Sequence, residues 1–383
     1  MADPMRREQT ALYAGFRASL RELSVYFCLG SAGNSAMCGK SESMSTVYVF
    51  GAGASYHAGY PLASALGGPL LNEMLRSPDS WHVAAAEYLS DHFGEPGDFE
   101  DWITRILSQR DAAKNDSNRG LEYRRLGTRL GVLIESLSEW FRRIGNESTA
   151  PLYGEFADRI VHAGDVVITF NYDDALDREL KRAGKWDAFS QGYGFLLGNG
   201  EHISDVLLLK LHGSMNWVWN PFGGARAGSF FTGSWPSLGL APVMLPRDLK
   251  FLGYDDPSGA GIYQSGGALH SMILPGRSKQ FYVETSLGIE QAEFWERLWS
   301  RAEEALRACG KIVVCGYSLP VADQRARELL FETPPKSASI EVVAGGDSER
   351  IASEFKSAEF SNIITFGRGH FEDWWFRRAD LSH

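Results

Sequence analysis

Short apolar runs alternate with longer amphipathic stretches along most of the chain. An apolar run of a few residues that ends in a turn signal is typical of a buried strand. We predict strands in these runs, at 47–50, 165–169, 206–211, 311–314, 338–346 and 362–367. The amphipathic stretches predict helices, most clearly at 121–145, where Leu126, Leu130, Leu133 and Leu137 recur at helical spacing.

This alternation defines both the fold class and the organisation of the chain. Strands that alternate with helices predict βαβ units and an α/β fold with a Rossmann-like parallel sheet. Residues 62–163 are mainly helical and form an insertion within the main domain, 44–383. Glycine, serine and proline are frequent in residues 220–285, which predicts long loops.

Residues 1–43 look separate from the main domain. Leu12, Phe16, Leu20 and Leu23 recur at helical spacing, and a Gly/Ser-rich stretch follows them. We expect an N-terminal helical extension and a linker. Two origins stay open, a native docking helix or a start placed upstream of Met44.

Charge and cysteine content exclude several classes of protein. The 383 residues carry a net charge of −10, which disfavours a direct nucleic-acid partner held by bulk charge. The four cysteines form no C-x-x-C pair, so no zinc ribbon or other metal site is expected. Sparse cysteine and the absence of a long apolar run favour a cytoplasmic protein without a membrane segment.

A glycine pair follows the first predicted strand, in the stretch "VYVFGAGAS". The G-x-G-x-x-G fingerprint of dinucleotide-binding folds fails here, because Tyr56 stands where the third glycine should be. The P-loop pattern fails as well, since no Gly-Lys-Ser/Thr follows. A helix beginning near Leu62 would still direct its positive end at a phosphate. Both nucleotide binding and a plain turn stay open for this stretch alone.

Similar small or polar residues follow three further predicted strands. These segments read "TFNYDD", "LHGS" and "CGYSLP". In an open parallel sheet, ligands bind beyond the carboxyl ends of the strands. Four such segments in one chain therefore predict a shared pocket at that edge.

Taken in order, the four motifs resemble those of the sirtuin, or silent-information-regulator, family. "GAGAS" is similar to its Gly-Ala-Gly-x-Ser loop, "TFNYDD" to its Thr-Gln-Asn-x-Asp segment, "KLHGS" to its His-Gly segment and "GYSLP" to its Gly-Thr/Tyr-Ser-Leu turn. The family's glutamine is Phe170 here, and Leu62 and Ala63 replace its Asp-Phe pair. No cysteine lies between His212 and Cys309, so the zinc module of deacylase sirtuins is missing.

These departures make the chain most similar to zinc-free, sirtuin-like bacterial proteins of anti-phage defence. The resemblance implies the sirtuin type of sheet (the DHS-like NAD/FAD-binding fold). It also implies an NAD+ glycohydrolase that depletes NAD+ as its substrate, needs no metal and assembles as a homo-oligomer. A HerA-type ATPase is the partner it suggests. The alternatives are a non-catalytic subunit that senses NAD or ADP-ribose, and an NAD-dependent protein deacylase.

The same resemblance assigns roles to individual residues. The catalytic pair is His212, as the base that contacts ribose hydroxyls, and Asn171, which positions the attacking water and the ribose. A histidine suits proton transfer at neutral pH, and an amide orients hydroxyls without carrying charge. The residues expected to bind the cofactor are Gly51, Ala52, Gly53, Ser55, Asp173, Gly213, Ser214, Gly316, Tyr317, Ser318 and Asp323. The last four follow one strand and are expected on the adenosine side.

Overall fold

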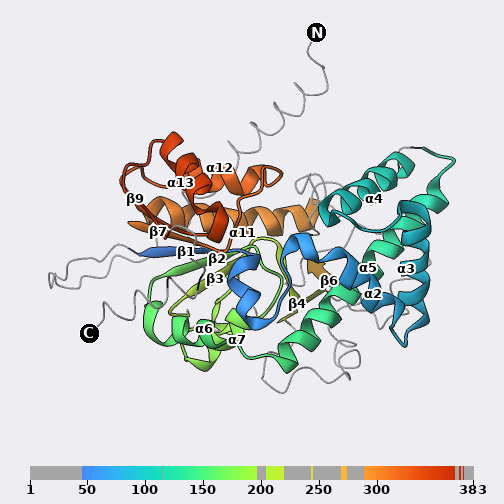
Figure 1. Cartoon of the computed structure of the whole chain (residues 1–383), viewed down its shortest axis with the longest axis horizontal. Coiled ribbons are helices and arrows are strands. Elements are labelled where there is room, and N and C mark those ends of the chain that lie inside the picture. Colours follow the sequence, from blue (N-terminus) through green and yellow to red (C-terminus); the bar gives the residue numbers. More distant parts are fainter. Residues whose placement is uncertain are drawn as a thin grey trace, which may run out of the picture. The chain divides into compact units, whose positions relative to one another are not determined.

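The computed structural model describes residues 45–114, 116–195, 204–219, 243–244, 269–273 and 289–366, together with Phe371 and Trp374 (Figure 1). The chain divides into two units, Met1–Ser43 and Met44–His383, and the described residues all belong to the second. The predicted N-terminal helix and most of the predicted 220–285 loops lie outside the described residues.

The centre of the fold is a six-stranded parallel sheet. Its strand order is β3-β2-β1-β7-β8-β9, with all neighbouring pairs parallel. The strands are β1 (Thr46–Phe50), β2 (Val166–Thr169), β3 (Leu207–Lys210), β7 (Lys311–Cys315), β8 (Ser339–Val343) and β9 (Ile363–Thr365). This is the order of the doubly wound Rossmann fold, in which successive strands are added first on one side of the first strand and then on its other side. The predicted α/β class and parallel sheet are therefore confirmed.

Helices cover both faces of this sheet, which explains why its central strands are apolar throughout. Figure 1 places α11, α12 and α13 on one side and α6 and α7 on the other. Their bounds are α6 (Pro151–Glu155), α7 (Ala175–Arg182), α11 (Ile289–Ala308), α12 (Gln324–Glu332) and α13 (Ser348–Ser357). Short turns of other helix types are η4 (Phe156–Ile160), η5 (Ala188–Ser190) and η6 (Gly345–Asp347).

A second, smaller sheet follows β3 directly and was not predicted. It contains β4 (Gly213–Trp219), β5 (Val243–Met244) and β6 (Leu269–Met272), with β4 in the middle. Two of these strands fall in the 220–285 segment that the composition predicts as loops, so that prediction is wrong at β5 and β6. Gly213, at φ +85°, turns the chain straight from the His-Gly segment into β4.

The region predicted as mainly helical contains α2 (Gly67–Leu75), α3 (Ser80–Phe93), α4 (Phe99–Lys114) and α5 (Gly120–Glu147). The apolar stripe of α5 is buried, with Leu126, Leu130 and Leu137 among its core residues. The predicted helix start near Leu62 is wrong. Two 3₁₀ turns, η2 (Ala52–Ala58) and η3 (Ala63–Ala65), precede α2, which begins at Gly67. Gly59, at φ +83°, ends η2. Within the described ranges, no helix is long and apolar enough to cross a lipid bilayer.

Candidate functional site

The loops after β1 and β7 meet at the point where the strand order of the sheet reverses. The Gly53 amide donates to the Gly316 carbonyl at 2.8 Å, and the Gly51 amide donates to the Cys315 carbonyl at 3.1 Å. A Cβ on Gly316 would lie 2.1 Å from the Ala54 nitrogen, so only glycine permits this approach. The glycine pair is thus explained by backbone packing. Both amides already donate hydrogen bonds within the protein, so the binding of a pyrophosphate by them stays a prediction.

Asn171, beyond the end of β2, fastens the glycine loop from the other side. Its Nδ2 donates to the Gly51 carbonyl at 2.9 Å and to the Ser55 hydroxyl at 3.0 Å. Ser55 is buried and also hydrogen-bonds the hydroxyl of Tyr153 at 2.8 Å. Three predicted residues therefore form one network, and Tyr153 on α6 is a member that the motifs did not indicate.

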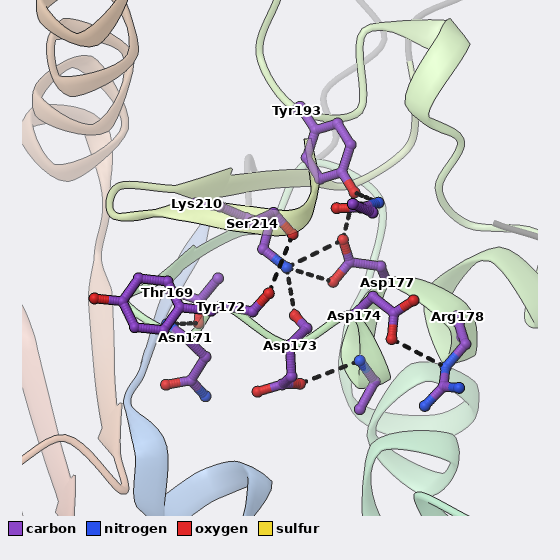
Figure 2. Close-up of polar contacts among 12 residues, drawn as sticks. Thr169, Asn171, Tyr172, Asp173, Asp174, Asp177, Arg178, Tyr193, Lys210 and Ser214 are labelled. Carbon is purple, nitrogen blue, oxygen red and sulfur yellow. Dashed lines mark hydrogen bonds and ion pairs between the residues drawn. The ribbon is translucent and has the colours of Figure 1, made fainter. Parts of the chain in front are cut away.

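Asp173 and Lys210 join the ends of β2 and β3 (Figure 2). Lys210 is fully buried, and its Nζ donates to the Asp173 carbonyl and lies 3.1 Å from Asp177 Oδ2. The Asp173 carboxylate accepts from the Ala175 amide at 3.1 Å and so caps the start of α7. Burial raises the pKa of Asp173, while Lys210 and the Ser55 hydroxyl oppose that rise. The segment that carries Asn171 is thus held by a buried cation.

The acid next in sequence, Asp174, has a weaker partner. Its carboxylate is almost completely buried and lies 3.5 Å from Nε of Arg178, one helical turn along α7 (Figure 2). Burial raises its pKa to about 6, and the Arg178 charge only partly offsets this. Asp174 therefore titrates close to neutrality inside the protein.

His212, in the turn after β3, lies against residues from two other strand ends. Its Nε2 is 3.4 Å from Asp323 Oδ2, and the Tyr317 hydroxyl donates to the same oxygen at 2.6 Å. The ring of Phe170 stacks on Tyr317, with centroids 4.2 Å apart, and meets His212 edge-on at 4.9 Å. The side chains of His212, Asp323 and Tyr317 are buried. Phe170, where the sirtuin motif has glutamine, forms the apolar wall of this cluster.

Two further predicted residues, Ser214 and Ser318, differ in where they lie. The buried Ser214 hydroxyl donates to the Tyr172 carbonyl at 3.3 Å, so Ser214 supports the Asn171 segment from β4 (Figure 2). Ser318 is exposed, and its carbonyl accepts from Arg350 on α13. The structure therefore groups Tyr317 and Asp323 with His212, and it leaves Ser318 outside that group.

The site contains buried polar residues that the sequence did not single out. No role is predicted for Lys210 from the run 206–211 or the segment "KLHGS", although a lone charge within an apolar run is a signal of a buried ion pair. Asp177 receives a hydrogen bond from Tyr193 at 2.5 Å, and Asn216 of β4 donates to the same tyrosine at 3.0 Å. No sequence spacing links these residues, because they lie on different elements.

The described part of the chain contains no group of three or more His, Cys, Asp or Glu side chains arranged to hold a metal ion. Cys309 and Cys315 are both buried, and burial raises the pKa of the Cys309 thiol to about 11. Neither thiol is therefore a thiolate near neutral pH.

Comparisons with known proteins give a likeness of fold. No protein-family model matches the sequence, and no curated protein matches it. Among solved structures, the chain is similar to a sirtuin structure described under the structural basis of sirtuin substrate affinity. The sequence identity is 13%, the match covers 89% of this chain and 96% of that chain, and the TM-score is 0.39. It is also similar to one on the mechanism and regulation of Sir2 enzymes, with 15% identity, 89% and 95% covered, and a TM-score of 0.39. A third is Sir2Tm bound to a propionylated peptide, with 12% identity, 89% and 94% covered, and the same TM-score.

Proposed function

We propose that the protein is an NAD+ glycohydrolase that cleaves NAD+ to nicotinamide and ADP-ribose. One observation carries this proposal. Asn171 and His212 follow the neighbouring parallel strands β2 and β3, and β2 pairs with β1, beside which the strand order reverses. Dinucleotides bind at this place in Rossmann-like sheets. An amide and an imidazole at that edge are suited to a reaction at the ribose.

The reaction needs few groups. Water adds to C1′ of the nicotinamide ribose as the glycosidic bond breaks, so nicotinamide leaves neutral and one proton is released. The ribose passes through an oxocarbenium-like transition state, as in other glycoside hydrolyses. In this proposal the Asn171 Oδ1 accepts from the water or a ribose hydroxyl, because both hydrogens of its amide are engaged by Gly51 and Ser55. His212 accepts the proton.

The binding roles proposed from the motifs complete this picture. Gly51, Ala52 and Gly53, at the start of η2, are proposed to contact the pyrophosphate from the motif resemblance. Ser55, Asp173, Gly213 and Ser214 are proposed to contact NAD+ beside Asn171. An antiviral role through NAD+ depletion, a homo-oligomeric state and a HerA-type ATPase partner are proposed from the motif resemblance alone.

A non-catalytic sensing subunit is the second candidate. The observation that favours it is burial, since only 8% of Asn171 and 4% of His212 are exposed. Residues that are this enclosed can hold a nucleotide without admitting the water that hydrolysis requires. The same site then binds NAD+ or ADP-ribose and releases it unchanged.

One experiment separates these two functions. The purified chain is incubated with NAD+, alone and with any ATPase that co-purifies, and the products are separated by chromatography. We expect ADP-ribose and nicotinamide in equal amounts, without any acylated peptide. His212→Ala and Asn171→Ala should each lower the rate by about 10²-fold or more. His162→Ala, at an exposed histidine, is the matched control and should behave as wild type.

Products that form only with an acylated peptide would instead identify a deacylase. Binding of NAD+ measured by calorimetry, with no turnover under any condition, would establish the sensing subunit and exclude the glycohydrolase.

A further inference from the structure

The pairing of His212 with Asp323 brings together residues from two distant parts of the sheet. His212 follows β3 at one edge of the sheet, and Asp323 is the residue before α12, beyond β7. Their Nε2 and Oδ2 atoms are 3.4 Å apart, and both side chains are at least 95% buried. In a buried environment, an imidazole and a carboxylate at this separation interact more strongly than they would in water.

The turn that carries Asp323 is rigidly built. Leu319 is completely buried and has φ +48°, a conformation that a leucine rarely adopts. Arg327 of α12 donates to the Leu319 carbonyl at 3.1 Å, and the Asp323 amide donates to the Pro320 carbonyl at 3.0 Å. Such backbone strain persists only where surrounding contacts fix it, so the position of Asp323 is set in advance.

The position of Asp323 at a helix start does not account for its carboxylate. An aspartate in that place usually accepts from a backbone amide of the first turn. The Asp323 side chain makes no such bond, and it instead accepts from Tyr317 and faces His212. Phe170 closes the cluster from the side of β2 with an apolar ring.

We propose that Asp323 is the positioning residue of His212. It keeps the proton of the neutral imidazole on Nε2, so that Nδ1 is the nitrogen that accepts a proton from the substrate. The Tyr317 hydroxyl holds the carboxylate in place by occupying the same oxygen. A carboxylate that fixes the tautomer of a general base in this way contributes through the histidine, without touching the substrate. This role replaces the cofactor-binding role that the motif resemblance predicts for Asp323.

The part of this inference that concerns the substrate rests on the proposed function. As the glycosidic bond breaks and water adds to C1′, a ribose hydroxyl gives its proton to Nδ1 and regains one from the added water. The Asp323 carboxylate balances the imidazolium that forms, and His212 then releases the single net proton to solvent. The tautomer itself does not depend on any reaction. It can therefore be measured on the protein without NAD+.

The test combines a tautomer measurement with kinetics. The full chain is labelled with ¹⁵N at its histidine rings, and the His212 signals are assigned by their loss in His212→Gln. We expect neutral His212 with its proton on Nε2 in the wild type. In Asp323→Asn, whose amide can donate to Nε2, the proton should move to Nδ1. Tyr317→Phe, which keeps the ring stack, should give a mixture of the two tautomers.

The kinetic arm uses the same variants with Asp79→Asn as control. Asp79 also precedes a helix, α3, but lies in the helical insertion and accepts from the Trp81 amide. Asp323→Asn should lower kcat by about 10²–10⁴-fold, with the Kd for NAD+ within about threefold of wild type. Tyr317→Phe should lose less, and Asp79→Asn should lose nothing.

Two results would overturn the inference. One is the finding that neutral His212 in the wild-type protein carries its proton on Nδ1, a result that does not depend on the folding of the Asp323 or Tyr317 variants. The other is an unchanged tautomer in a folded Asp323→Asn protein. If the tautomer moves as expected but no variant, nor the wild type, consumes NAD+, then the pairing stands and the proposed function fails.

Discussion

The Asn171 side chain donates to the Gly51 carbonyl at 2.9 Å, and this bond ties the end of β2 to the glycine loop beyond β1. These two residues are 120 positions apart in sequence. The amide that we place at the reacting ribose is thus also a structural clamp. Its removal is expected to affect both the stability of the fold and the chemistry.

Asn171→Ala should therefore destabilise the protein as well as inactivate it. The substitution leaves the buried Ser55 hydroxyl and the Gly51 carbonyl with one partner fewer, at a cost of about 1–3 kcal/mol in the free energy of unfolding. Asn171→Asp keeps the shape but removes both donors, and it should cost at least as much. Urea unfolding, followed by circular dichroism, measures both. A residue that served the ligand alone would leave the unfolding free energy unchanged.

The approach of Gly316 to Ala54 gives a second prediction. Gly316→Ala adds a Cβ at 2.1 Å from a backbone nitrogen, in a residue with φ +61°. Overpacking and conformational strain each cost about 1–3 kcal/mol, so the loss should exceed 2 kcal/mol. Gly184→Ala is the control, because Gly184 has φ +71° but nothing within 4 Å of its Cβ position. The difference between the two variants in urea unfolding isolates the contact from the strain.

The sheet could be predicted from the sequence because its strands are buried runs of apolar residues. Each predicted run contains one observed strand, and the motifs after β1, β2, β3 and β7 do lie at one edge. The parallel pairing then follows from the alternation with helices. The order of the strands does not follow, because it depends on contacts between elements far apart in sequence.

Details of the site were harder to predict for the same reason. Tyr153 meets Ser55 across 98 positions, and Lys210 meets Asp177 across 33. The motif resemblance placed Tyr317 and Asp323 on the adenosine side, but it did not indicate that they would pack against His212. The short strands β5 and β6 were missed because glycine and serine around them mask any alternation.

The buried pair of Lys210 and Asp177 predicts a strong effect of removing one partner. Lys210→Met leaves the Asp177 carboxylate in the core without its cation, which should cost about 3–5 kcal/mol in unfolding free energy. The double variant Lys210→Met with Asp177→Leu removes both charges, so it should be more stable than the sum of the single variants. A double-mutant cycle in urea measures this coupling. Additive losses would show that the pair does not interact as the 3.1 Å separation implies.

Asp174 predicts how stability depends on pH. Burial raises its pKa in the folded protein to about 6 from an ordinary value of 3.8, so the folded state binds the proton more tightly than the unfolded state does. Protonated Asp174 therefore favours the fold below pH 3.8, and this contribution is lost as the pH rises through about 6. A difference of about 2 in pKa corresponds to roughly 3 kcal/mol in the free energy of unfolding.

Asp174→Asn removes the titrating group while keeping its shape, so the comparison with wild type isolates this effect from every other acid. The variant should gain unfolding free energy relative to wild type at pH 7, and the gain should shrink steadily between pH 6 and pH 4. Urea unfolding of both proteins across this range measures the difference. A gain that is independent of pH would mean that Asp174 stays charged in the fold, held by Arg178 at 3.5 Å against the cost of burial.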